Sequence, residues 1–232
     1  MRKEKTKKAI LALSFLMALI TNWSCGEDDG KNESIFSKSF VTHYYFPDTL
    51  EIIYQEKKFD TIAVSLSLDG TDWAISPSYH LDGCEGKERI FDSLMIRYAD
   101  TTYNKDIYVG GNKALANPID SITIISDADY DENHIAGSNL SDVVVFEGHV
   151  FGYFVLHGYP NDYRYKEYYD DRSYYIKRLL SKFRPEDYYL WEAKPFLLKF
   201  PMPSLSKTHH ITFTFVTGGK TFKGTEELDF SK

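Results

Sequence analysis

From Ile35 onward the chain is a succession of short runs rich in β-branched and aromatic residues, separated by glycine, proline, asparagine and aspartate. In Thr61–Leu68, isoleucine, valine and leucine occupy every second position, with alanine and serine between them. Ile119–Ser126 repeats this alternation. Because successive side chains of a strand point to opposite faces, a period of two predicts β-strands with one apolar face.

The clearest hairpin lies near the C-terminus. Ile211–Val216 and Thr221–Phe222 flank the four residues Thr217-Gly218-Gly219-Lys220, and Leu228–Phe230 continues the second run. Two adjacent glycines can both take positive φ, which tight two-residue hairpin turns require. The pattern therefore predicts two antiparallel strands joined by a turn at the glycine pair.

Further strand candidates recur roughly every 8–15 residues, without helices alternating between them. They are Ser39–Tyr45, Leu50–Tyr54, Ile90–Ala99, Ile107–Val109, Val143–Phe146 and Phe151–His157. A series of short strands with turn residues between them is typical of an all-β, mainly antiparallel fold. We therefore expect residues 35–232 to form a single Ig-like β-sandwich domain.

One segment departs from this rhythm. The stretch Tyr163–Phe183 contains neither proline nor glycine, and aromatic and aliphatic residues recur in it at helical spacing. Such spacing places apolar side chains on one face of a helix, and Pro185 then stops the helix. The sequence thus predicts one helical insertion near residues 165–183.

The first 25 residues have a separate organisation. Met1–Lys8 is basic, and Ala9–Ile20 is apolar except for one serine. An apolar run of this length is too short to span a bilayer comfortably and is typical of a secretory signal peptide. Cleavage after residue 24 would remove five basic residues and Glu4, so the net charge would fall from −7 to about −11.

The end of this segment, Thr21-Asn22-Trp23-Ser24-Cys25, resembles the lipobox of bacterial lipoproteins. The resemblance implies a signal peptide over residues 1–24, acylation of the Cys25 thiol and a membrane anchor of two or three fatty acyl chains. Simple secretion with an unmodified Cys25 is the alternative. Residues 25–34 are then expected to form a flexible acidic linker.

Glu27, Asp28 and Asp29 follow the cysteine after a single glycine, Gly26. This acidic cluster resembles the surface-export signal of Bacteroidota-type lipoproteins, and most of the chain is similar to small Ig-like lipoprotein domains of unknown function in that group. The resemblance implies an outer-membrane location with the domain exposed at the cell surface. A domain on the periplasmic face is the alternative.

The negative net charge of the chain argues against one class of partner. Phosphate contacts in nucleic-acid complexes are made largely by lysine and arginine, and no basic stripe remains once the signal peptide is removed. Nucleic acid is therefore not an expected partner. Cys84 would be left without a second cysteine, so no internal disulfide is expected.

Asp127, Asp129 and Asp131 form the strongest candidate for metal chemistry. Alternating carboxylates supply the oxygen ligands that Ca²⁺ prefers. An EF-hand loop needs glycine at its sixth position and glutamate at its twelfth, where this chain has Glu132 and Ser138. The segment is therefore either a Ca²⁺-binding loop of another kind or a solvated acidic loop between two strands, and no other cofactor is expected.

The densest aromatic stretch runs from Tyr159 to Tyr169 and continues to Tyr188, Tyr189 and Trp191. Aromatic rings stack on sugar faces and dominate protein interfaces, but they also fill cores. Tyr188, Tyr189 and Trp191 are therefore candidates for a face that contacts an unknown glycan or protein, with core packing as the alternative.

No nucleophile elbow, P-loop or zinc-protease motif occurs in the chain. The leading hypothesis is accordingly a lipid-anchored envelope protein that acts as a non-enzymatic binding module. An envelope-anchored hydrolase acting on glycan or peptide would need acidic or histidine side chains that converge in a cleft. A structural subunit of a pilus or adhesin would need an exposed strand edge.

Overall fold

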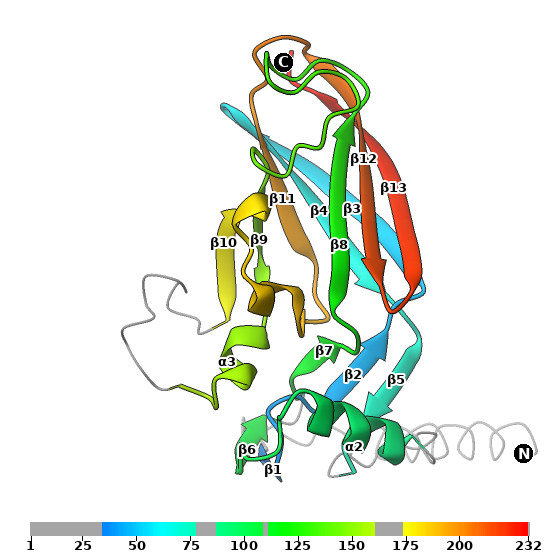
Figure 1. Ribbon diagram of the computed structural model, residues 1–232, viewed down its shortest axis with the longest axis vertical. Helices are drawn as coiled ribbons and strands as arrows, with labels where there is room; N and C mark the ends of the chain where they lie inside the picture. Colours follow the sequence, from blue (N-terminus) through cyan, green and yellow to red (C-terminus); the bar gives the residue numbers. More distant parts are fainter. Residues whose placement is uncertain (1–33, 78–86, 109–110, 161–173, 232) are drawn as a thin grey trace, which may run out of the picture. The chain divides into compact units, whose positions relative to one another are not determined.

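Two antiparallel sheets pack face to face in the computed structural model, which describes residues 34–77, 87–108, 111–160 and 174–231 (Figure 1). The larger sheet has the order β10-β9-β11-β4-β3 and the smaller one the order β13-β12-β8. The larger sheet comprises β3 (Thr49–Lys58), β4 (Thr61–Asp69), β9 (Val145–His149), β10 (Tyr175–Leu179) and β11 (Phe196–Pro201). The smaller sheet comprises β8 (Ile119–Ser126), β12 (Thr208–Thr217) and β13 (Lys220–Asp229). The predicted all-β, mainly antiparallel sandwich is confirmed.

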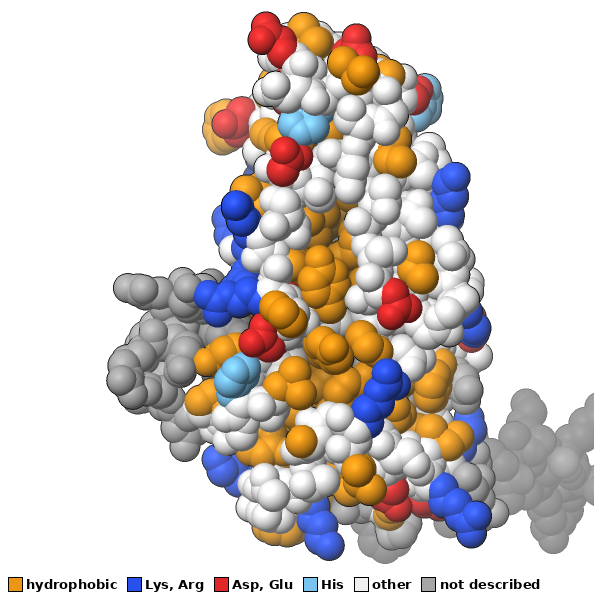
Figure 2. Space-filling model, in the orientation of Figure 1, with side chains coloured by type: hydrophobic (Ala, Val, Ile, Leu, Met, Phe, Trp, Pro, Cys, Tyr) orange, Lys and Arg blue, Asp and Glu red, His pale blue; other side chains and the backbone are white. Residues whose placement is uncertain are grey.

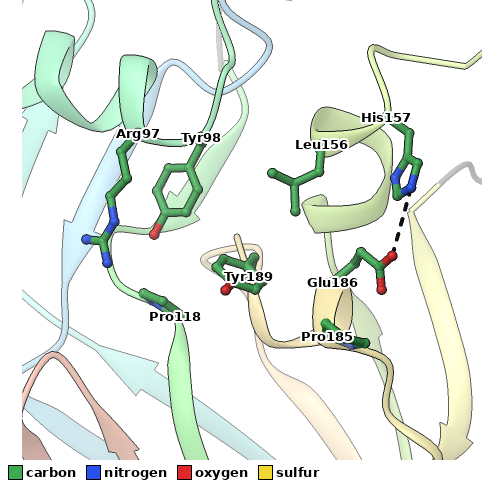
Figure 3. Close-up of a pocket in the computed structure, with 8 residues that line it drawn as sticks. All are labelled: Arg97, Tyr98, Pro118, Leu156, His157, Pro185, Glu186 and Tyr189. Carbon is green, nitrogen blue, oxygen red and sulfur yellow. Dashed lines mark ion pairs between the residues drawn. The ribbon is translucent and has the colours of Figure 1, made fainter.

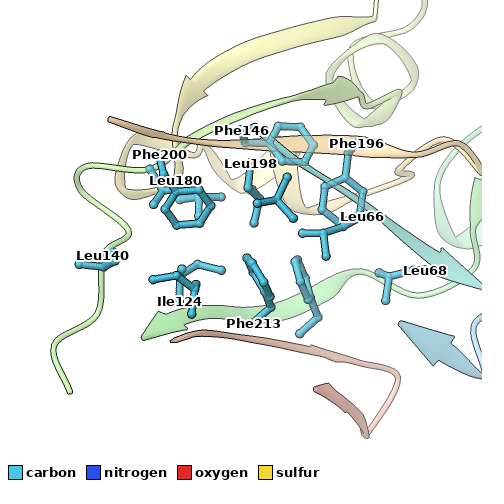
Figure 4. Packing of buried hydrophobic residues seen from close by; sticks show 14 of the residues in the cluster. Leu66, Leu68, Ile124, Leu140, Phe146, Leu180, Phe196, Leu198, Phe200 and Phe213 are labelled. Carbon is cyan, nitrogen blue, oxygen red and sulfur yellow. The ribbon is translucent and has the colours of Figure 1, made fainter. Parts of the chain in front are cut away.

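The core lies between these two sheets. Leu66, Leu198 and Phe146 come from the larger sheet, and Ile124 and Phe213 come from the smaller one (Figure 4). All five side chains are buried. Burying apolar side chains on both inner faces is the main favourable contribution to the stability of such a sandwich.

The two strand patterns that alternate most regularly are confirmed. Thr61–Leu68 lies within β4, and Ile119–Ser126 is β8. In β4 the serine and alanine side chains of the second face are also buried, because β4 is a central strand between β3 and β11. The predicted hairpin joins β12 to β13, with φ of +58° at Gly218 and +75° at Gly219.

A second apolar cluster lies beside the sandwich and includes Tyr44, Phe91 and Tyr98. Three short strands form the order β5-β2-β7, in which β2 and β7 are parallel. Two others, β1 and β6, pair with each other. The elements of this region are β1 (Ser34–Ser37), β2 (His43–Phe46), β5 (Asp72–Ile75), α2 (Glu88–Arg97), β6 (Lys105–Tyr108), β7 (Lys113–Leu115) and α3 (Gly152–Leu156).

Three predictions of local structure are wrong. Ile90–Ala99 is mostly helix α2, and the apolar run Phe151–His157 contains helix α3 instead of a strand. The helix predicted near residues 165–183 does not extend through its C-terminal part, because Tyr175–Leu179 is strand β10 and Leu180–Lys182 is the short 3-10 helix η2. Residues 161–173 lie outside the described part of the chain.

Residues Ser34–Lys232 form one compact unit. The predicted signal peptide, Cys25 and the cluster Glu27, Asp28 and Asp29 lie outside the described residues. Within the described ranges, none of the helices has the length and hydrophobicity needed to span a bilayer.

Candidate functional site

A pocket of about 540 Å³ opens where α2, α3, the start of β8 and the 3-10 helix η3 (Pro185–Tyr188) approach one another (Figure 3). Figure 2 shows hydrophobic side chains gathered on this face of the molecule. The pocket is lined by Arg97, Tyr98, Pro118, Leu156, His157, Pro185, Glu186 and Tyr189.

The first wall is the C-terminal end of α2. Phe91 and Leu94 are buried on one face of the helix, and Tyr98 follows at the same helical spacing and is buried as well. This anchoring places Arg97 at the pocket, in the last turn of the helix, where a cation interacts favourably with the helix dipole. The Arg97 Nη1 lies 3.3 Å from the Asn117 side-chain oxygen.

Tyr98 has a fixed hydrogen-bonding role in that wall. Its hydroxyl donates to the Ala116 carbonyl oxygen at 2.8 Å. Burial raises the pKa of Tyr98 to about 12, so the phenol is neutral at physiological pH. The centroid of its ring lies 5.6 Å from the Arg97 guanidinium carbon, within the range of a cation–π contact.

The second wall is formed by α3 and η3. His157 Nδ1 donates to the Tyr153 carbonyl oxygen at 2.9 Å, and the two rings stack with centroids 4.1 Å apart. That bond turns Nε2 toward Glu186, whose Oε1 lies 3.9 Å away. The other oxygen, Glu186 Oε2, is buried and has no hydrogen-bond partner in the described part of the chain.

An acceptor of this kind is costly to leave unsatisfied, because a buried carboxylate oxygen without a donor loses its hydration without compensation. Because Oε2 is shielded on all sides, a ligand in the pocket can contact only the exposed part of Glu186, whose side chain is 26% exposed.

Tyr189 contributes an aromatic surface between the two walls. Its ring is half-buried and meets the Tyr98 ring edge to face, with centroids 6.2 Å apart. The Tyr189 amide donates to the Glu186 carbonyl oxygen at 3.2 Å, which fixes the backbone after η3. Tyr189 thereby presents a ring close to both charged groups of the pocket.

A buried ion pair holds η3 in place. Asp187 Oδ2 accepts from Arg178 Nη1 at 2.6 Å and from the Arg184 amide at 2.8 Å. Burial raises the pKa of Asp187, against the opposing influence of the Arg184 amide and the Arg178 charge. Trp191 Nε1 donates to the Asp187 carbonyl oxygen at 2.7 Å, so the η3 backbone is tied to the core.

The predicted aromatic residues are distributed over three environments. Trp191 is 2% exposed and packs in the core against Phe146 and Phe196, so it offers no surface for contact in this structure. Tyr188 is half-buried against Phe183. Of the three, only Tyr189 lines the pocket.

The three aspartates proposed for Ca²⁺ are engaged separately. Asp127 pairs with His210 at 2.7 Å, Asp129 accepts from the Ala136 amide at 2.8 Å, and Asp131 pairs with His134 at 2.7 Å. Among the residues that the structure describes, no three histidine, cysteine, aspartate or glutamate side chains come together as a metal site. Each of the three aspartates thus has its own hydrogen-bond partner, and Asp127 is joined to β12 through His210.

A second polar cluster lies on the outer face of the larger sheet. Glu147 is 6% exposed and accepts from Lys199 Nζ at 2.7 Å and from the Tyr175 hydroxyl at 2.8 Å, and Lys177 Nζ lies 2.9 Å away. Burial disfavours the charged carboxylate, but these three partners outweigh it and lower the pKa of Glu147. A carboxylate held ionised in this way stabilises the strand arrangement and is poorly suited to donate a proton.

Sequence reasoning missed most of the pocket. Arg97, His157 and Glu186 come from segments about 30 to 90 residues apart, and nothing in one sequence brings them together. Only the aromatic density around Tyr189 gave a clue. No protein-family model, curated protein or solved structure is significantly similar to this chain.

Proposed function

We propose that this chain is a lipid-anchored protein of the bacterial outer membrane, exposed at the cell surface, whose sandwich domain binds a sugar unit of a glycan. The N-terminal pattern supports the location: a basic start, an apolar run and Cys25 followed by three acidic residues. The pocket supports the binding role. The protein is in this proposal a binding module and not a catalyst.

The observation that carries the proposal is that one pocket holds the Tyr189 ring, the Arg97 guanidinium and the Glu186 carboxylate. A sugar ring has an apolar C–H face that stacks on an aromatic ring. Each of its hydroxyl groups both donates and accepts a hydrogen bond, so different hydroxyls of one sugar can donate to Glu186 and accept from Arg97. Opposite charges within one pocket suit a neutral, polyhydroxylated ligand.

A glycan-binding screen of the full chain tests this proposal. We expect at least one glycan to bind, and we expect Tyr189→Ala, Arg97→Gln and Glu186→Gln each to weaken binding by about tenfold or more. Tyr54→Ala is the matched control, because Tyr54 is 52% exposed on β3 and does not line the pocket. Wild-type affinity in all three pocket variants, or no binding of any glycan by the wild type, would contradict the proposal.

A second candidate function is hydrolysis of a glycan or peptide, and the His157–Glu186 pair favours it. A histidine beside a carboxylate can exchange protons with a substrate. If the pocket is catalytic, product release from a bound glycan will be measurable and Glu186→Gln will abolish it while leaving binding detectable. Binding without product release supports the binding module.

The alternative of a structural subunit finds no support at the outer edge of β8. That edge is blocked toward its end, because the Leu140 and Gly137 amides donate to the carbonyl oxygens of Ile124 and Ser126 at 2.8 Å each. A partly covered edge is a poor acceptor for a partner strand.

A further inference from the structure

The turn between β3 and β4 carries an unusual aromatic residue. Phe59 is the first of the two turn residues, has a φ of +44° and is 100% exposed. A bulky residue with positive φ is strained, and glycine is preferred at this position of a two-residue turn. Phe59 also buries no surface. It therefore opposes folding through its backbone and contributes no packing in return.

Three further exposed apolar side chains lie at the same end of the sandwich. Ile135 is 63% exposed in the loop after β8, and Met202 and Leu205 are 37% and 49% exposed in the loop after β11. We call the surface formed by Phe59, Ile135, Met202 and Leu205 the tip surface. Figure 2 shows hydrophobic side chains at this upper end, with acidic side chains beside them.

The loops of the tip surface are fixed to one another. The Met202 amide donates to the Asp60 carbonyl oxygen at 2.7 Å, which joins the β3–β4 turn to the loop after β11. The Leu205 amide donates to the Tyr130 carbonyl oxygen at 3.3 Å, and the Tyr130 hydroxyl donates to the Pro201 carbonyl oxygen. Binding to loops that are already held in position costs less conformational entropy.

Acidic side chains surround these apolar groups. The loop from Asp127 to Asp142 contains five carboxylates and no lysine or arginine. Asp60 and Glu132 are exposed. Lys57, Lys58 and Lys207 are the basic residues nearest this end: Lys57 is exposed on β3, Lys58 pairs with Glu56 at 2.9 Å, and Lys207 donates to the Pro203 carbonyl oxygen at 2.9 Å, so carboxylates still outnumber these lysines. The local charge therefore favours a basic partner over an anionic lipid surface.

We propose that the tip surface docks a protein partner through an apolar patch flanked by lysine or arginine. A strained, exposed phenylalanine that contributes nothing to the fold is accounted for by contact with such a patch. β1, the first strand of the described unit, lies at the end opposite the tip surface (Figure 1).

The test uses the full chain and a synthetic peptide of alternating lysine and leucine, with a glutamate–leucine peptide for comparison. We expect the basic peptide to bind, and Phe59→Gly to weaken binding by about tenfold or more. Glu132→Lys should also weaken it. Ile96→Ser and Asp92→Lys are the matched controls on α2, where Ile96 is 68% exposed and Asp92 is exposed, and we expect both to bind like the wild type.

Three results would overturn the proposal. The first is a failed affinity difference: either the wild type and Phe59→Gly bind the basic peptide with the same affinity, or the wild type binds the basic and the acidic peptide with the same affinity. The second is a lower melting temperature of Phe59→Gly, because it would give Phe59 a structural role. The third is Phe59-dependent binding to phosphatidylglycerol vesicles in place of the peptide. Tyr189→Ala should leave peptide binding unchanged, which keeps this test separate from that of the sugar pocket.

Discussion

Gly152 lies against the carbonyl oxygen of Glu186, and this contact sets how closely α3 can approach η3. A Cβ on residue 152 would overlap that oxygen and lie 2.8 Å from the Tyr189 carbonyl oxygen. Both contacts are with backbone atoms, which cannot rotate away as a flexible side chain can. The spacing between α3 and η3, which together form the second wall of the pocket, therefore depends on a residue without a side chain.

Gly152→Ala should consequently separate α3 from η3. We expect a loss of about 1–3 kcal/mol in the free energy of unfolding, because overpacking forces the backbone to shift. Sugar affinity should fall as well, since Glu186 and Tyr189 would move. Chemical denaturation and a binding titration measure the two effects. Gly224→Ala is the control, because its Cβ would meet only side-chain atoms, of Ile52 at 3.2 Å and of Leu50 at 3.5 Å. If Gly152→Ala is as stable as this control, the close contact is not a constraint.

The Arg178–Asp187 pair should contribute strongly to stability. Arg178→Met leaves the Asp187 carboxylate buried without its cation, and removing one partner of a buried pair costs about 3–5 kcal/mol. Burial raises the pKa of Asp187, so we expect the loss to shrink as the pH falls and the carboxyl is protonated. Unfolding of Arg178→Met between pH 4 and 7 checks both the size and the pH dependence.

The double variant Arg178→Met/Asp187→Asn removes both charges and should recover part of the stability. A double variant that is less stable than Arg178→Met alone would argue against an uncompensated charge as the cause. Such a result would point to the hydrogen bond between Asp187 and the Arg184 amide instead.

His43 should make the fold sensitive to acid. Burial and the nearby charge of Lys113 lower the pKa of His43 to about 4. The unfolded chain, with an ordinary histidine pKa near 6.5, binds this proton at higher pH than the folded chain does. Stability should therefore fall as the pH drops from about 6.5 to 4, by about 3 kcal/mol over the whole window.

His43→Asn removes this titration while keeping a polar side chain near Thr42, whose hydroxyl lies 2.8 Å from His43 Nδ1. Comparing the free energy of unfolding of the wild type and the variant at pH 5 and pH 7 isolates the contribution of His43. The account requires a smaller difference between the two pH values in the variant, and an unchanged difference would refute it.

Several strands that could be predicted from the sequence have partners next to them in the chain, whereas β8, whose partner β12 is distant in the sequence, was predicted from its period of two alone. The β12–β13 hairpin closes through Gly218 and Gly219, and β4 joins β3 through a two-residue turn. Local turn chemistry and a period of two are then sufficient.

The elements that were predicted wrongly are decided by contacts with residues that are distant in the sequence. The segment of α2 fits two patterns: its isoleucines fit a strand, whereas Phe91, Leu94 and Tyr98 are spaced as on a helix. The helix forms because Tyr98 then packs against Tyr44 in the second apolar cluster. In β10 the aromatic residues matched helical spacing by chance. Pairing of Tyr175 with His149 on β9, distant in the sequence, overrides that local preference.

The central claim is that this domain is held at the envelope by an acylated Cys25. Mass spectrometry of the N-terminal peptide of the native protein tests it most directly. We predict a mature chain that begins at Cys25 and carries two or three fatty acyl chains. An N-terminus that still includes Met1, or a Cys25 that bears no fatty acid, would contradict the claim.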